Sequence, residues 1–465
     1  MGALRSERGV NATAPVAPVP QFLRTHAEAH ARLAGSLPGG GAWLRRRKQA
    51  LERVMQLGLP GSHDEAWKYA PVRLLAQRAA DPARPEPIPS DTAEAADTAD
   101  AAAHKASFSV PQARRLVFVD GRFAPALSDE PAAIDDLRAD FLADLMRAVP
   151  DALLDRLAAH SDRAEDRLAL LNDAFLAEGI VIRVPAGATP APLHLQFVSA
   201  SADRATHPRV IVEVEQGAHL QLIEQHLGNA VGNSVANGVT QVDLRASATL
   251  EHYLLLESTD HAQVLHGTYV KQHRDSHLIQ HRLLLGGELA RASLQARLEE
   301  SGAAIEANSL ALTPGSEYAD AHSVIEHCAP QTRSQERYRA AAGKGGRCVF
   351  NGRIIVREGA VGSDSQQSSR GLLLEPGGEI DARPQLEIYT DDVKCSHGAT
   401  TGRLDPDMLF YLLSRGIDAA TARGLLVFAF LDDVVARMSF DAVRRHLERR
   451  IAMALPDAPV IREFL

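Results

Sequence analysis

The chain has 465 residues, 45% of them hydrophobic, so it can bury a substantial core in two or three domains. Its net charge of −9 and isoelectric point near 6.1 exclude a global cationic field, so we expect neither nucleic acid nor an anionic membrane surface as a partner. The three scattered cysteines suit a reducing compartment, and no apolar run reaches the roughly 20 residues that cross a bilayer, so we expect a cytoplasmic protein.

The amino-terminal part is expected to be helical. Residues 1–19 are rich in Ala and Pro, and we expect a disordered tail there. Over residues 20–178, apolar side chains such as Leu51 and Val54 recur at helical spacing. Residues 79–107 interrupt this pattern with Ala, Pro and Asp and almost no bulky apolar side chains, which predicts a flexible link.

Residues 179–402 change to a strand pattern. Short apolar or alternating segments begin near Leu250, Val264, Leu278, Arg291, Ala304 and Glu317, at intervals of thirteen or fourteen residues, with no helical segment between them. A sandwich would also use short, evenly spaced strands. The uniform repeat favours a β-solenoid, in which each coil covers its neighbour and free strand edges remain only at the two ends. We therefore predict a mainly β fold with a β-solenoid core.

Helical spacing returns in residues 403–465, which we expect to form a carboxy-terminal helical domain. Asp405 is a suitable N-cap with Pro406 at the first helical position, and Asp418 is suited to cap a second helix. A third, Arg-rich helix is expected from about residue 440 to residue 454. The apolar faces of these helices exceed what so small a tail can bury, which indicates a docking surface.

The stretch PQLEIYTDDVKCSHGATTG, residues 384–402, places Cys395 and His397 just behind two aspartates and Lys394. A nucleophilic thiol needs a nearby base and positive surroundings, which His397 and Lys394 offer and the aspartates oppose. A closed zinc site needs four ligands, and this pair supplies two, at a spacing too tight for most single-ion sites. A polar bend is the third interpretation, and the residues alone leave all three open.

Other candidate ligands lie elsewhere in the strand region. Cys328 and Cys348 have no spacing that forces them together, and we interpret them as small buried apolar residues. The region also contains many histidines, which we interpret as solvated side chains, although a stacked ladder is conceivable in a solenoid: His219, His226, His252, His266, His277, His281 and His322.

Two nucleotide motifs are missing from the sequence. It contains no Gly-x-x-x-x-Gly-Lys-Ser/Thr loop, and no Gly-x-Gly-x-x-Gly that follows a strand and opens a helix. We therefore expect that this chain binds no nucleotide itself, and we assign it no catalytic residue.

The 384–402 stretch, with its continuation through Leu409–Leu412 and Ser414–Ile417, resembles the SufB/SufD family of iron–sulfur cluster assembly proteins. Three more segments resemble motifs of that family: DEAWKY at Asp64–Tyr69, LNDAF at Leu171–Phe175 and GIVIRVP at Gly179–Pro185. The resemblance covers most of the chain except its first twenty residues and the link at 79–107.

The resemblance implies a right-handed parallel β-helix between two helical regions. It implies a scaffold, not an enzyme, that pairs with a SufB-like subunit through the β-helix and docks a SufC-like ABC ATPase through the carboxy-terminal helices. A nascent iron–sulfur cluster would form at the interface of this SufBCD complex, with His397 and Cys395 as the iron, cluster or sulfur contacts of this chain. Reduced flavin binds the complex in some relatives.

Within the family the sequence is most similar to the SufD type. In B-type chains a glutamate follows the histidine, whereas here Gly398 follows His397, and residues 363–369 lack the upstream cysteine of B-type chains. The alternative is a β-helix enzyme acting on polysaccharide, but such enzymes line one face with carboxylates and aromatics, and only 5% of this chain is aromatic. We expect His397 to matter more than Cys395, because neutral imidazole is a competent iron ligand, whereas a thiol among acidic neighbours is poorly activated.

Overall fold

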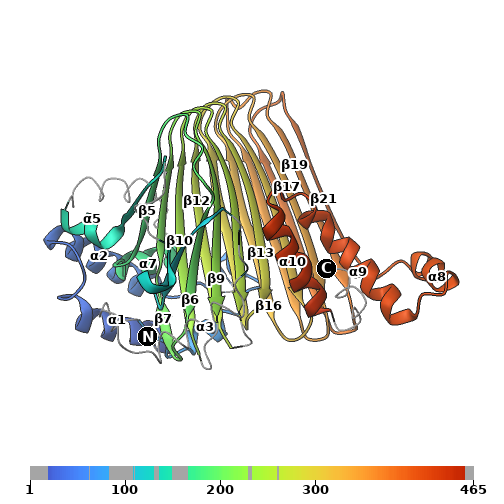
Figure 1. Ribbon diagram of the computed structural model, residues 1–465, viewed down its shortest axis with the longest axis horizontal. Coiled ribbons are helices and arrows are strands. Elements are labelled where there is room, and N and C mark those ends of the chain that lie inside the picture. The colour runs from blue at the N-terminus through green and yellow to red at the C-terminus, as the bar shows by residue number, and fades with distance from the viewer. Residues whose placement is uncertain are drawn as a thin grey trace, which may run out of the picture.

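The computed structural model describes residues 19–61, 63–82, 108, 110, 112–129, 136–148, 166–228, 233–258 and 261–455. Its centre is a parallel β-solenoid of about eight turns with helices at its amino-terminal and carboxy-terminal ends (Figure 1). The predicted mainly β fold between two helical regions is therefore confirmed. The predicted tail and most of the predicted link lie outside the described residues. Within the described ranges, no helix is long and apolar enough to span a membrane.

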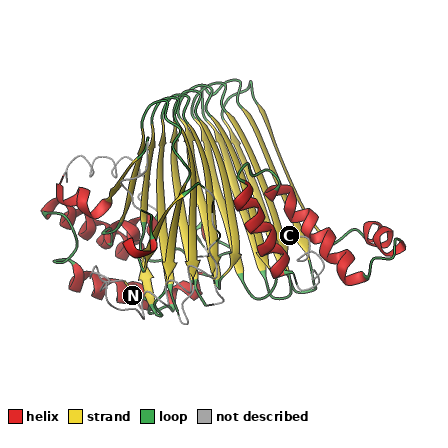
Figure 2. Ribbon diagram, in the orientation of Figure 1, coloured by secondary structure: helices red, strands yellow, loops and turns green. Residues whose placement is uncertain are grey.

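Two sheets form the walls of the solenoid, and the chain alternates between them (Figure 2). The 11-stranded sheet contains β1 (Asp81–Pro82), β4 (Arg138–Phe141), β5 (Gly179–Val184), β7 (Arg204–Thr206), β8 (Arg209–Val214), β10 (Val235–Leu244), β12 (Gln263–Gln272), β14 (Leu289–Leu298), β16 (Tyr318–His327), β18 (Arg347–Val356) and β20 (Glu379–Ile388). The 10-stranded sheet contains β2 (Arg114–Val119), β3 (Arg122–Phe123), β6 (Leu193–Ser199), β9 (His219–Gly228), β11 (Thr249–Ser258), β13 (His277–Gly286), β15 (Ala304–Thr313), β17 (Arg333–Ala342), β19 (Asp364–Leu373) and β21 (Lys394–Gly402).

The alternating residues of each strand build the core. Val212, Val242 and Val270 share one register position on β8, β10 and β12, and all three are buried in the main apolar cluster of the solenoid. Because strand residues two apart lie on the same face, every second side chain points inward and stacks on its counterparts in the adjacent coils.

The strands begin earlier than the predicted boundary at residue 179. β2 extends one sheet by pairing with β6, and β4 pairs antiparallel with β5. Helical spacing was expected over residues 20–178, but Leu137 and Phe141 instead pack against the end of the solenoid core. Two apolar residues four apart fit both a helix face and a strand that covers a core, so the spacing alone was misleading.

The helices at the amino-terminal end of the solenoid are α1 (Gln21–Leu33), α2 (Gly41–Leu57), α5 (Leu142–Ala148) and α7 (Arg167–Ala174). The short helix α3 (Val72–Ala76) lies farther along, where Leu75 belongs to a buried cluster with Leu289 and Tyr318. Asn172 on α7 donates from Nδ2 to the backbone oxygens of Pro208, at 3.0 Å, and Asn237, at 2.7 Å. Arg209 donates to the carboxylate of Asp173 at 2.6 Å. The LNDAF segment therefore fixes α7 to the strands through buried polar side chains.

The DEAWKY segment lies against the outer face of the 11-stranded sheet. The guanidinium of Arg291 on β14 is 3.9 Å from the ring centroid of Trp67 and donates to the backbone oxygen of Ala66 at 3.0 Å. Tyr318 on β16 donates its hydroxyl to the backbone oxygen of Tyr69. A cation–π contact and two hydrogen bonds thus hold this segment against the solenoid wall.

The carboxy-terminal helices are α8 (Pro406–Ser414), α9 (Ala419–Val435) and α10 (Asp441–Ala454). α9 and α10 pack on the outer face of the 10-stranded sheet, where Leu431 and Leu447 join a buried cluster with Leu283 and Leu310. α8 projects away from the solenoid at the far end of the molecule (Figure 1). As predicted, Asp405 and Asp418 cap α8 and α9.

Candidate functional site

The stretch with Cys395 and His397 forms β21, the last strand of its sheet. Within the described chain β21 pairs only with β19, and β20, the last strand of the other sheet, pairs only with β18. No further coil among the described residues covers them, so side chains of β20 are half-buried and most of those on β21 are exposed. The carboxy-terminal end of the solenoid is therefore open, whereas helices cover its amino-terminal end (Figure 1).

Cys395 and His397 share the inward-facing side of β21. In the ladder Cys395 lies opposite Ser365 and His397 opposite Gln367, both buried inside the preceding coil. Gln367 donates to the carboxylate of Glu336 at 2.7 Å. His397 therefore continues a column of inward-facing polar residues to the open end, where its own side chain is exposed.

Cys395 is partly buried against the solenoid core, together with Val393 and Leu386. Burial raises the pKa of its thiol, and the nearby carboxylate of Asp364 raises it further. Because the thiolate is the reactive form, the thiol of Cys395 is not activated in this environment. The greater importance of His397 over Cys395 remains a prediction.

The other cysteines lie away from this end. Cys348 is fully buried on β18, where its thiol contacts the hydroxyl of Thr313 at 3.2 Å, and burial raises its pKa to about 12. Cys328 is half-buried, and its pKa is raised first by burial and then by Glu326. The interpretation of Cys348 as a buried apolar residue is confirmed, and Cys328 is less enclosed than expected.

An exposed apolar surface lies next to the open end. Met408, Phe410 and Tyr411 on α8 are all more than half exposed, and no residue of α8 is buried. The expected excess of apolar surface in residues 403–465 is thus concentrated on α8, because α9 and α10 bury most of theirs on the solenoid.

The interpretation of the histidines as solvated side chains is wrong for most of them. His219 and His277 are partly exposed, but five others are buried: His226, His252, His266, His281 and His322. Among the described residues, one group offers metal-ligating atoms that all lie within 4.8 Å of one another: Glu224, His226 and His266. The sequence contained a signal for them, since all three fall on the inward phase of otherwise apolar strands.

Comparison with known proteins places this architecture in a family. The family model described as "SUF system FeS cluster assembly, SufBD core domain" matches residues 197–430. The chain is 30% identical to the iron-sulfur cluster assembly protein SufD of Escherichia coli, over 88% of this chain and 92% of that protein. It is 28% identical to a SufBD family protein of Synechocystis, over 88% of this chain and 90% of the relative. It is also 27% identical to the chloroplastic protein ABCI7 of Arabidopsis thaliana, over 86% of this chain and 83% of that protein.

Proposed function

Because this chain belongs to the SufBD family of iron–sulfur cluster assembly proteins, we propose that it is the SufD-type scaffold subunit of a cytoplasmic SufBCD complex. Membership of the family gives the chain a role in iron–sulfur cluster assembly. In the proposed complex it pairs with a SufB subunit, docks the SufC ATPase and supplies surfaces and ligands rather than turnover. The open end of the solenoid, with His397 and Cys395 on it, is the observation that carries the proposal.

Pairing with SufB is proposed at the free edge of β21. The amide of Lys394 donates to the backbone oxygen of Ser363 at 2.9 Å, so it faces the preceding coil. Since backbone groups of successive strand residues point alternately to opposite sides, those of Cys395, His397 and Ala399 face the open edge. A strand of SufB added to this edge would satisfy them and cover the inward-facing side chains of the last coil.

Docking of SufC is proposed on α8. This helix holds Met408, Phe410 and Tyr411 exposed to solvent, although apolar side chains clustered on so short a helix are normally covered. The ATPase of the complex then lies beside the same end of the solenoid that pairs with SufB, which supports coupling between nucleotide hydrolysis and changes at the pairing interface.

The nascent cluster is the cargo of this interface, and His397 is the proposed ligand from this chain. A single imidazole cannot hold a cluster, so the remaining ligands would come from SufB across the interface. The protonated and partly buried thiol of Cys395 is the secondary contact, consistent with its raised pKa.

Co-purification of the tagged chain, expressed with SufB and SufC, tests the proposed complex. We expect both partners to co-purify with the wild-type chain, whereas Ala399→Pro, which removes an outward-facing N–H, should lose SufB and retain SufC. Gly398→Ala is the matched control on the same strand, because an added Cβ meets no atom within 4 Å. Loss of SufB from the control, or full retention by Ala399→Pro, would contradict pairing through this edge.

A further inference from the structure

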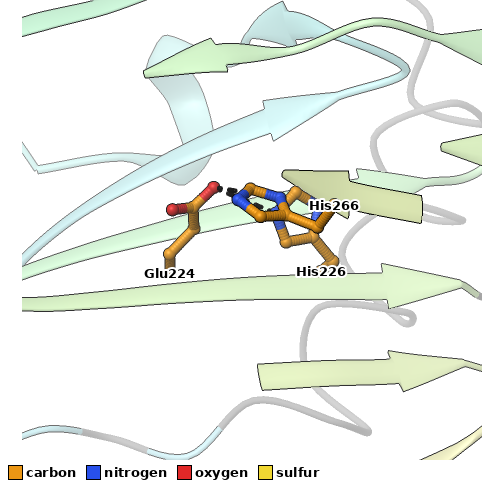
Figure 3. Close-up of side chains that lie close together, drawn as sticks. All are labelled: Glu224, His226 and His266. Atoms are coloured by element: carbon orange, nitrogen blue, oxygen red, sulfur yellow. Dashed lines mark hydrogen bonds and ion pairs between the residues drawn. The ribbon is translucent and has the colours of Figure 1, made fainter. Parts of the chain in front are cut away.

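Glu224, His226 and His266 converge inside the solenoid (Figure 3). Their strands, β9 and β12, lie several coils away from β20 and β21 at the open end. Glu224 and His226 lie on β9 and His266 lies on β12 of the facing sheet, and each is at most 2% exposed. Oε1 of Glu224 is 3.0 Å from Nε2 of His226 and 3.7 Å from Nδ1 of His266. One carboxylate oxygen therefore faces two imidazoles from opposite walls of the solenoid.

The other carboxylate oxygen of Glu224, Oε2, has two polar partners. Thr240 donates its hydroxyl to Oε2 at 2.7 Å, and Nε2 of His252 lies 3.2 Å from the same atom. The amide Nε2 of Gln280 donates to Nδ1 of His252 at 3.1 Å, so His252 carries its proton on Nε2 and donates it to Glu224. These neighbours orient the carboxylate as outer-sphere partners orient metal ligands.

The imidazoles of the cluster, in contrast, are underused. Among the described residues, neither ring nitrogen of His266 has a hydrogen-bond partner, and Nδ1 of His226 has none. Buried nitrogens without partners are costly, and native interiors rarely retain them.

Glu224 has no lysine or arginine partner among the described residues. Its ionic contacts within the described chain are all to histidines. A buried carboxylate without a lysine or arginine beside it is suited to a bound cation, which would neutralise its charge between these ligands.

The interior has room for the two imidazoles because residue 238 is glycine. A Cβ on Gly238 of β10 would lie 2.6 Å from Nδ1 of His266 and 3.0 Å from Cε1 of His226. Gly238 and His266 also line a groove of about 700 Å³ on the outside of the 11-stranded sheet, next to Trp67. The groove therefore reaches the outer side of the wall at the two strands that carry Gly238 and His266.

We propose that Glu224, His226 and His266 bind one divalent first-row transition-metal ion, of the iron(II) or zinc(II) class, inside the solenoid. Two imidazoles and a carboxylate are a donor set for these ions. Ions held about 2.1 Å from each donor need donors roughly 3 to 3.5 Å apart, and the contacts of Oε1 at 3.0 Å and 3.7 Å approach this spacing. The site is separate from Cys395 and His397 and does not depend on the proposed function.

Cobalt(II) titration is the test, because its visible d–d absorption reports coordination by nitrogen and oxygen ligands. The parent protein carries Cys395→Ser and His397→Ala, so that the open end cannot contribute, and is stripped of metal with a chelator. We expect saturation at about one equivalent of cobalt and displacement by zinc. A parent protein without a saturable signal would contain water or empty space at this position, and the proposal would be overturned.

Three variants locate the ion. His266→Gln should weaken cobalt binding by about a hundredfold or more, and Gly238→Ala should do so with all three ligands retained, because its methyl group intrudes between the imidazoles. His281→Gln is the matched control, since His281 is buried with both ring nitrogens unpaired among the described residues but lies outside the cluster. Circular dichroism verifies the fold of each variant. Unchanged binding in folded Gly238→Ala, or equal loss in His281→Gln, would refute the assignment.

Discussion

Phe410→Ala on α8 tests the proposed SufC dock quantitatively. Phe410 is 71% exposed, and a phenylalanine side chain presents about 200 Å², so roughly 140 Å² remains to be covered. At about 25 cal/mol per Å², covering this area is worth at most about 3.5 kcal/mol. Incomplete burial in the complex reduces this value, so we expect Phe410→Ala to weaken SufC binding by about 2 kcal/mol, roughly thirtyfold in Kd.

Isothermal titration of purified SufC into the chain measures this change. The free energy of unfolding should change by less than about 0.5 kcal/mol, because the removed atoms are largely exposed. Leu44→Ala is the matched control, since Leu44 is 42% exposed on α2, at the opposite end of the molecule (Figure 1). Equal Kd values for Phe410→Ala and the wild-type chain would show that SufC does not dock on this face of α8.

Two further predictions concern the stability of the chain. Burial lowers the pKa of His327 from 6.5 to about 4 in the folded chain. As the pH falls, the unfolded chain therefore binds a proton at this residue before the folded chain does. The contribution of neutral His327 to the free energy of unfolding is complete above pH 6.5 and is lost between pH 6.5 and pH 4. Between pH 7 and pH 5 this residue should lower the free energy of unfolding by about 2 kcal/mol, and His327→Gln should remove that part of the pH dependence measured by urea unfolding. An unchanged dependence of the free energy of unfolding on pH in His327→Gln would contradict the prediction. Asn172→Ala should lower the free energy of unfolding by about 3 kcal/mol, because it leaves two buried backbone oxygens and the guanidinium of Arg209 short of partners. A loss below about 0.5 kcal/mol in urea titration would contradict this role of Asn172 as an anchor.

The solenoid was predictable because its signal is local and repeated. Many strands carry apolar residues at inward positions two apart, such as Leu220 and Leu222 on β9, and the strand spacing leaves no room for intervening helices. The first strands were not predicted, since β4 is only four residues long, from Arg138 to Phe141, and too short to show a period. The position of α8 could not be predicted from the sequence either, because its apolar spacing is the same whether the helix packs on the solenoid or projects from it.

One of the two candidate sites could be predicted from the sequence, and the other was missed. Cys395 and His397 were found from their motif, and strand alternation already placed both on one face. The buried cluster was missed because its histidines were treated as polar and therefore solvated. The alternation Leu220, Leu222, Glu224, His226 puts the last two on the apolar, inward side, which was readable from the sequence. The approach of His266 from the facing sheet could not be predicted from the sequence, because it depends on how the two sheets face each other across the interior.

Complementation in cells that lack the native SufD gene tests the proposed role of the open end in cluster assembly. The measurement is the activity of a cluster-dependent enzyme, with each variant expressed at a matched level. The wild-type chain should restore activity, Cys395→Ser should restore most of it, and His397→Ala should fold and assemble yet restore little, because an exposed strand residue contributes little to stability. Failure of the wild-type chain to complement, or full complementation by His397→Ala, would contradict the account of the open end as the place where this chain serves cluster assembly.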